Sequence, residues 1–215
     1  MIETVLFDLD GTILDTNELI IESFIHVMEG KMDPPLTRER LIHQMGKPLA
    51  MQMRYFSGRG EQEPVDDLIR EYRAYNLRRH DELVRPFPYV KEVLQSLKDS
   101  GIRLGVVTSK IRLTSDKGLT LCGIKDYMET IVTIEDVQHA KPHPEPVLEA
   151  LKRMNAKPET ALMVGDSPFD IESAHQAGVQ AVGVAWSLKG AEVLSKYNPE
   201  YVIDDMRELL KIVQQ

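Results

Sequence analysis

Four aspartates in two closely spaced pairs are the residues of this chain best placed to do chemistry together. Asp8 and Asp10 are two positions apart, and Asp166 and Asp170 are four apart. On a straight strand, side chains two positions apart point the same way. A nucleophilic carboxylate and an acid/base partner could therefore flank one phosphorus atom. Gly11, the next residue, allows the backbone to turn tightly beside a ligand.

Other polar residues also follow short apolar runs. Thr108 and Ser109 come directly after residues 104–107, and Lys141 follows residues 131–132 at a short distance. In an open parallel sheet, ligands bind beyond the carboxyl ends of the strands. If these runs are strands, four carboxylates, two hydroxyls and one lysine could converge in a single crevice.

So many acidic groups need a counter-charge. Their mutual repulsion would raise their pKa values sharply unless a cation lay among them. Because every candidate ligand is an oxygen, Mg²⁺ is favoured over zinc, and the six histidines show no spacing typical of ligands. Taken singly, Asp166 or Asp170 could be only a helix N-cap. The four aspartates together with Lys141 favour a site.

The elements that must position these residues form an alternating pattern. Short runs rich in branched apolar residues are typical of strands buried on both faces, and they lie at residues 5–7, 104–107, 131–132, 161–164 and 181–184. Helical patterns occupy residues 144–154 and 170–177 between the later runs. This alternation predicts an α/β fold with a parallel sheet wrapped by helices.

A long helical stretch separates the first two strands. Apolar residues recur at helical spacing, for example Leu19, Phe24 and Val27, and turns are expected at residues 30–35 and 58–64. The stretch is too long for a simple crossover. We therefore expect an α/β core at residues 1–14 and 84–215, with a small helical cap domain inserted at residues 15–83.

Composition sets limits on location and partners. The chain has 215 residues, a formal net charge of -8 and a single cysteine. With no run or face rich in Lys and Arg, neither a nucleic acid nor a membrane is expected as a partner. The N-terminus lacks the features of a signal peptide, and one cysteine excludes a disulfide framework. We expect a cytoplasmic protein.

The motifs resemble those of the haloacid dehalogenase (HAD) superfamily, in its phosphatase form, over the whole core and in order. The matching segments are Asp8-Leu9-Asp10-Gly11-Thr12, Thr108-Ser109, Lys141-Pro142-His143-Pro144 and Gly165-Asp166-Ser167-Pro168-Phe169-Asp170. The resemblance implies a Rossmann-like core. The insertion is similar to the smaller, C1-type cap found in phosphoglycolate phosphatases and β-phosphoglucomutases.

The resemblance also implies roles for individual residues. Asp8 would attack phosphorus and become an aspartyl-phosphate, while Asp10 would protonate the leaving group and later activate water. Mg²⁺ would be held by Asp8, by the backbone carbonyl of Asp10 and by Asp166. Thr108 and Lys141 would bind the transferring phosphoryl group with help from Gly11 and Ser109, and Asp170 would orient Lys141.

The substrate is a small phosphorylated molecule in every version of this interpretation. Stretches such as residues 15–21, 132–137 and 186–190 resemble the inorganic pyrophosphatases that Gram-positive bacteria pair with HPr kinase/phosphorylase. The segment Gly46-Lys47-Pro48-Leu49 looks more like a phosphoglycolate phosphatase, and Tyr89 stands where many relatives carry glycine. A phosphoglycolate or other phosphomonoester phosphatase, and less so a phosphomutase, therefore remain alternatives.

Two further questions stay open at this point. Lys47 in the cap, and Lys189 and Arg112 in the core, could contact a substrate anion or be ordinary solvated cations. Outside enzymology, a phospho-receiver signalling domain also combines acidic residues, a hydroxyl and a lysine on a parallel sheet. Receiver domains are shorter and lack the large helical insertion, so catalysis is favoured.

Overall fold

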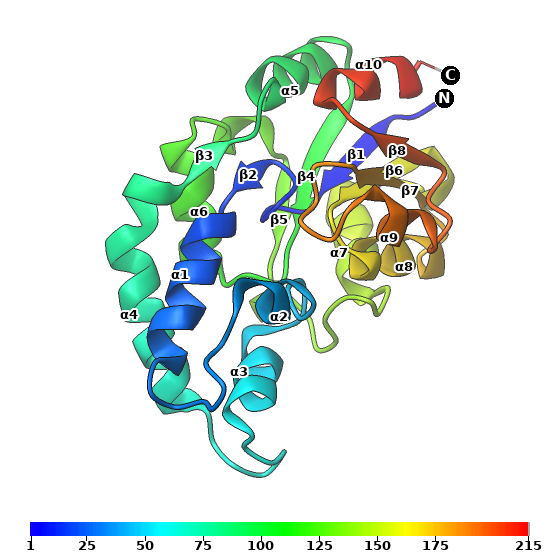
Figure 1. Cartoon of the computed structure of the whole chain (residues 1–215). Coiled ribbons are helices and arrows are strands. Elements are labelled where there is room, and N and C mark those ends of the chain that lie inside the picture. Colours follow the sequence, from blue (N-terminus) through cyan, green and yellow to red (C-terminus); the bar gives the residue numbers. More distant parts are fainter. Residues whose placement is uncertain (215) are drawn as a thin grey trace. The chain divides into compact units, whose positions relative to one another are not determined.

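The computed structural model describes residues 1–214 and divides into two compact units. One unit combines Met1–Asp15 with the chain from Arg85 onward, and the other is Thr16–Val84. The first unit contains a parallel sheet with helices, and the second consists of helices alone (Figure 1). From the sequence, the inserted cap domain was expected at residues 15–83.

A six-stranded parallel sheet forms the centre of the first unit. Its order is β5-β4-β1-β6-β7-β8, and every neighbouring pair is parallel. The strands are β1 (Thr4–Phe7), β4 (Arg103–Val107), β5 (Thr130–Val132), β6 (Ala161–Gly165), β7 (Gln180–Val184) and β8 (Tyr201–Ile203). The chain runs outward from β1 to β5 and then crosses back to β6. The crevice beside the carboxyl end of β1 is therefore the expected ligand position.

Helices cover both faces of this sheet. Helices α7 (Glu145–Met154) and α8 (Pro168–Gln176) pack against the strands and against each other, over a core that includes Leu6, Val107 and Ala174. Helices α5 (Val90–Asp99) and α10 (Leu209–Ile212) pack together on the opposite face (Figure 1). The remaining helices are α6 (Arg112–Leu121) and α9 (Ala191–Ser195). Coverage on both faces explains why all residues of β1 and β6 are buried.

The second unit is built around its first and last helices, α1 (Asn17–Met28) and α4 (Asp66–Leu83), which pack together and run antiparallel (Figure 1). Between them in the chain come α2 (Arg38–Ile42) and α3 (Leu49–Ser57). The Phe24 ring of α1 meets the rings of Tyr72 at 5.0 Å and Phe56 at 5.8 Å, in edge-on contacts. The predicted turns at residues 30–35 and 58–64 fall between helices. The break between α2 and α3 was not predicted.

Two short pairings escaped the sequence prediction. Strands β2 (Leu14–Asp15) and β3 (Arg85–Pro86) pair antiparallel where the chain leaves and re-enters the first unit. Strand β8 adds three residues at the edge of the large sheet. The two-residue strands β2 and β3 are too short to show an apolar period. The strands predicted at residues 5–7, 104–107, 131–132, 161–164 and 181–184 are all confirmed.

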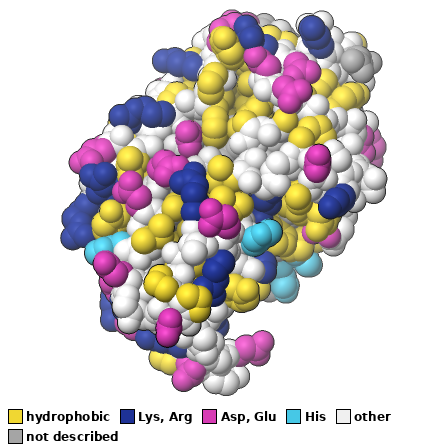
Figure 2. All heavy atoms as spheres, viewed as in Figure 1, with side chains coloured by type: hydrophobic (Ala, Val, Ile, Leu, Met, Phe, Trp, Pro, Cys, Tyr) yellow, Lys and Arg dark blue, Asp and Glu magenta, His cyan; other side chains and the backbone are white. Residues whose placement is uncertain are grey.

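The surface carries mixed charges. Figure 2 shows Lys and Arg side chains interspersed with Asp and Glu over the visible face. Within residues 1–214, no helix combines the length and the apolar character required to cross a bilayer.

Candidate active site at the carboxyl ends of β1, β4 and β6

A buried lysine joins two of the predicted aspartates. Asp8 follows β1 directly, and its Oδ1 accepts a hydrogen bond from Lys141 Nζ at 2.7 Å. The same ammonium group donates to Asp170 Oδ1 at 2.5 Å and to the Val107 carbonyl at 3.0 Å. All three side chains are buried. Lys141 lies just before α7, and its side chain thus connects the ends of β1 and β4 with the start of α8.

Asp170 takes part in the cap of helix α8 and also contacts this lysine. Its Oδ2 accepts hydrogen bonds from the Ser167 backbone N–H at 3.0 Å and from the Ser167 hydroxyl at 2.7 Å. These bonds form part of a capping box at the start of α8. The other oxygen is left for Lys141. One Asp170 oxygen therefore takes part in helix capping and the other contacts Lys141, so the two interpretations of Asp170 are compatible.

Three carboxylates converge at the same place. Asp8, Asp166 and Asp170 each offer an oxygen, and these atoms lie within 4.8 Å of one another. Gly11 lies against this cluster with φ of +77°, and a Cβ added there would stand 2.4 Å from Asp166 Oδ2. Only glycine leaves the space that the Asp166 carboxylate occupies, and glycine also tolerates the left-handed conformation.

The electrostatics of the cluster favour the binding of a cation. Burial raises the pKa of Asp8 to about 7, which Lys141 opposes and Asp170 and Asp10 reinforce. Burial, with the charges of Asp8 and Asp170, also raises the pKa of Asp166 well above its ordinary value. One lysine does not balance this much negative charge. The donor set is made of oxygens alone, so the residues fit a hard divalent cation.

Burial by itself would lower the pKa of Lys141. The charges of Asp170 and Asp8, and the hydrogen bonds that they accept, outweigh burial and hold that pKa above its ordinary value. The lysine is therefore a permanent cation at neutral pH, as electrostatic binding of a phosphoryl group would require.

Asp10 has a partner that the sequence prediction missed. Its Oδ1 accepts a hydrogen bond from Lys110 Nζ at 2.6 Å, and the two side chains are only 23% and 15% exposed. Lys110 lies three residues after the end of β4, close to Thr108. A lysine near a strand end is more often a solvated cation, and sequence alone does not distinguish the two.

The predicted hydroxyl residues lie at the end of β4. The Thr108 backbone donates to the Val132 carbonyl at 2.9 Å, and Thr108 Oγ1 accepts the Lys110 N–H at 3.2 Å. Ser109 Oγ and Thr12 Oγ1 are buried and have no hydrogen-bond partner among the described residues. Unpartnered buried hydroxyls are uncommon. Both residues belong to the segments that directly follow β1 and β4, so these hydroxyls are candidates for contact with a polar ligand.

The three cations left open by the sequence have different surroundings. Arg112 donates to Asp136 Oδ2 at 2.7 Å and to the Ile131 carbonyl at 2.8 Å, so it is part of the internal framework. The charge of Lys189 lowers the pKa of Asp166, which places Lys189 within electrostatic reach of the cluster. Lys47 belongs to the helical unit, where its Nζ donates to Gln44 Oε1 at 2.7 Å.

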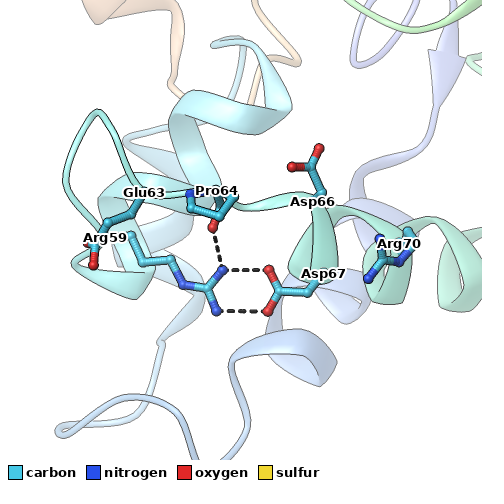
Figure 3. A pocket seen from close by; sticks show the side chains of 6 residues that line it. All are labelled: Arg59, Glu63, Pro64, Asp66, Asp67 and Arg70. Carbon is cyan, nitrogen blue, oxygen red and sulfur yellow. Dashed lines mark hydrogen bonds and ion pairs between the residues drawn. The ribbon is translucent and has the colours of Figure 1, made fainter.

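A separate pocket lies wholly within the helical unit. Its volume is about 460 Å³, and it lies between the end of α3 and the start of α4 (Figure 3). Its lining residues are Arg59, Glu63, Pro64, Asp66, Asp67 and Arg70. Arg59 is held by a bidentate pair with Asp67. None of the predicted site residues lines this pocket.

Known proteins resemble this chain over its whole length. Residues 5–184 match the model of the haloacid dehalogenase-like hydrolase family. A protein named Pyrophosphatase PpaX from Anoxybacillus flavithermus is 43% identical, covering 99% of this chain and 97% of its own. A protein of the same name from Bacillus pumilus is 45% identical, covering 99% and 96%.

Solved structures agree with this assignment. A haloacid dehalogenase-like hydrolase from Bacteroides fragilis has a TM-score of 0.91 at 29% identity, covering 97% of this chain and all of its own. A predicted phosphoglycolate phosphatase from Haemophilus somnus has a TM-score of 0.83 at 26% identity, covering 99% and 98%. The receiver-domain alternative is therefore wrong. By sequence and by fold, the chain belongs to the haloacid dehalogenase-like hydrolases.

Proposed function

We propose that this protein hydrolyses inorganic pyrophosphate to two phosphates, through an aspartyl-phosphate formed on Asp8 and with Mg²⁺ as cofactor. The observation that carries the chemistry is the pairing of Asp8 with Lys141 among further carboxylates. A buried cluster of this kind favours an anionic substrate only when cations outweigh its charge. The support for pyrophosphate is the full-length similarity to the pyrophosphatases named above.

In the first half-reaction, the free carboxylate oxygen of Asp8 forms a bond to phosphorus. The bond from phosphorus to the bridging oxygen breaks, and the second phosphate leaves. Asp10, protonated at this stage, gives its proton to the leaving oxygen. Lys141 offsets charge on the transferring phosphoryl group, while Thr108 and Ser109 hold its oxygens. Proton transfer by Asp10 would contribute roughly 10²–10⁴-fold to the rate.

In the second half-reaction, the carboxylate of Asp10 removes a proton from a water molecule. The water oxygen attacks the phosphorus atom of the aspartyl-phosphate, and the bond to the Asp8 oxygen breaks. Phosphate leaves, the Asp8 carboxylate is restored, and Asp10 is again protonated. Asp170 acts indirectly, by holding Lys141 in position through both steps.

The metal would be held by the side chains of Asp8 and Asp166 and by the backbone carbonyl of Asp10. Asp170 is not proposed as a ligand, because one of its oxygens pairs with the Lys141 ammonium, whose positive charge would repel a metal ion there, and the other accepts two hydrogen bonds from Ser167. When bound, Mg²⁺ supplies positive charge that offsets the phosphoryl oxygens and the attacking carboxylate.

A substrate comparison tests the proposal. Purified protein with Mg²⁺ is expected to release phosphate from pyrophosphate with a much higher kcat/KM than from phosphoglycolate. Asp8→Asn should abolish both activities while the circular dichroism spectrum and melting temperature stay close to those of the parent. A reversed ranking would replace pyrophosphate by a phosphomonoester. Full activity of Asp8→Asn would overturn the aspartyl-phosphate mechanism itself.

A further inference from the structure

Two exposed histidines and a glutamate converge on the segment that carries Lys141. His139 Nδ1 lies 2.7 Å from Glu145 Oε2, and His143 Nδ1 lies 4.0 Å from the same oxygen. One ligand atom from each residue lies within 4.8 Å of the other two. The imidazole rings are 4.5 Å apart between centroids. Sequence spacing alone did not predict this set, because the turn around Lys141 brings its members together.

We propose that His139, His143 and Glu145 form a second cation site, selective for borderline divalent ions such as Zn²⁺ over Mg²⁺. Zinc binds imidazole nitrogen and carboxylate oxygen at about 2.0–2.2 Å, so two donors in a tetrahedral shell stand about 3.3 Å apart. The observed separations of 2.7 and 4.0 Å lie on either side of that value. Small side-chain rotations would therefore bring the donors into position.

The glutamate is fixed before any ion arrives. Its Oε1 accepts the Gln138 backbone N–H at 2.8 Å, and its Oε2 accepts the His139 backbone N–H at 3.0 Å. Hydrogen bonds of this kind orient carboxylate ligands in metal sites. They also show what Glu145 does without a metal, since it stabilises the turn that leads into α7.

The Nδ1 atoms of the two histidines are in different states. His143 Nδ1 accepts the Glu145 backbone N–H at 3.1 Å, so this nitrogen carries a lone pair and no proton. The contact between His139 Nδ1 and the ionised Glu145 requires a proton between them, because a carboxylate oxygen can only accept. A divalent ion would replace that proton and the Glu145 N–H contact with ligand bonds.

Solvent access leaves room for the rest of the coordination shell. The side chains of His139, His143 and Glu145 are 61%, 50% and 31% exposed. Imidazole donors suit zinc, copper and nickel, whereas magnesium prefers an all-oxygen shell. The ligands stand two residues before, and two and four residues after, Lys141. An ion bound here would therefore connect the residues on either side of Lys141. The proposed cation site does not depend on which phosphate compound is the substrate.

Calorimetric titration of the full chain with Zn²⁺ tests the proposal, with millimolar Mg²⁺ present to occupy the aspartate cluster. One zinc ion should bind, and His139→Gln and His143→Gln should each weaken binding roughly tenfold or more, since even groups that only support metal ligands contribute 10–100-fold. His175→Gln is the matched control, because His175 is a partly exposed histidine beside one glutamate, Glu200, at 3.3 Å. It should leave zinc affinity unchanged.

A spectroscopic measurement provides an independent test. With Cu²⁺ as the probe and Mg²⁺ present, electron paramagnetic resonance should show coupling to two nitrogens, and to one nitrogen in either variant. Hydrogen exchange at residues 139–143 should slow when Zn²⁺ is added. Zinc binding that persists in both histidine variants and disappears in Asp166→Asn would assign the ion to the aspartate cluster and overturn the proposal. So would the absence of any zinc binding by the parent protein.

Discussion

Lys110 Nζ lies 2.6 Å from Asp10 Oδ1, so the proposed acid/base residue is held by a cation from the end of the neighbouring strand. Lys110→Met should lower kcat by about tenfold or more, because Asp10 would lose the contact that orients it for a proton transfer worth 10²–10⁴-fold. Lys110→Arg should recover part of the loss. Steady-state kinetics with pyrophosphate and Mg²⁺ measures both effects.

The control for Lys110 is another cation of the same unit. Arg112 is bound to Asp136 and to the Ile131 carbonyl, so Arg112→Met should reduce stability and leave kcat nearly unchanged. If Lys110→Met keeps the parent kcat, Lys110 has no positioning role and Asp10 is oriented by other groups.

Asp170→Asn tests whether the lysine needs a charged partner. The amide keeps the size of the side chain but no longer offers Lys141 a negative charge, and a small displacement of Lys141 would lower kcat by about 10²-fold. Ser167→Ala is the matched control, because it removes the hydrogen bond to the other Asp170 oxygen. It should cost about 1 kcal/mol of stability through the loss of the helix cap, with little change in kcat. Equal kcat values for the two variants would contradict this role.

Metal binding should release protons near neutral pH. In the metal-free protein the pKa of Asp8 is raised to about 7 and that of Asp166 is raised as well, so both carry protons that an ordinary carboxylate has lost. Mg²⁺ binds the ionised form. Its affinity should therefore fall as the pH decreases through about 7, and proton release should vanish well above that pH.

Calorimetry in buffers of different ionisation enthalpy measures this release directly.

The same rise in carboxyl pKa determines how the stability of the protein depends on pH. A raised carboxyl pKa means that the metal-free protein loses stability as the pH rises from about 4 to about 7, and the increase in melting temperature given by Mg²⁺ should grow over that range. Asp166→Asn should bind Mg²⁺ more weakly. Proton release that is zero at every pH would show that Asp8 and Asp166 are ionised before the metal binds.

Periodicity was sufficient to predict the main strands and the position of the acidic residues relative to them. Asp8, Lys141 and Asp170 could be placed together because parallel strands end at one edge of a sheet. Lys110 and the histidine cluster could not, because their contacts depend on side-chain rotamers and on the path of one turn. Strand β8 was not predicted, although its three residues are as many as those of β5, which was.

Tyr89 illustrates a departure that the backbone explains. The family resemblance led us to expect glycine at this position, and the structure places Tyr89 at φ of 63°, in the left-handed region. A non-glycine residue pays about 1–2 kcal/mol there. The Arg207 guanidinium lies 3.7 Å from the centre of the Tyr89 ring, a cation–π contact that offsets part of this cost.

Tyr89→Gly and Tyr89→Ala separate the backbone strain from the ring contact. Both lose the contact with Arg207, but only glycine relieves the strain, so the glycine variant should be more stable than the alanine variant by about 1 kcal/mol. Urea denaturation measures the difference. Tyr197 is the control, since it is 37% exposed and is not among the residues with positive φ; there the alanine variant should be at least as stable as the glycine variant. If the alanine variant is at least as stable as the glycine variant at position 89 too, the conformation of Tyr89 carries no strain.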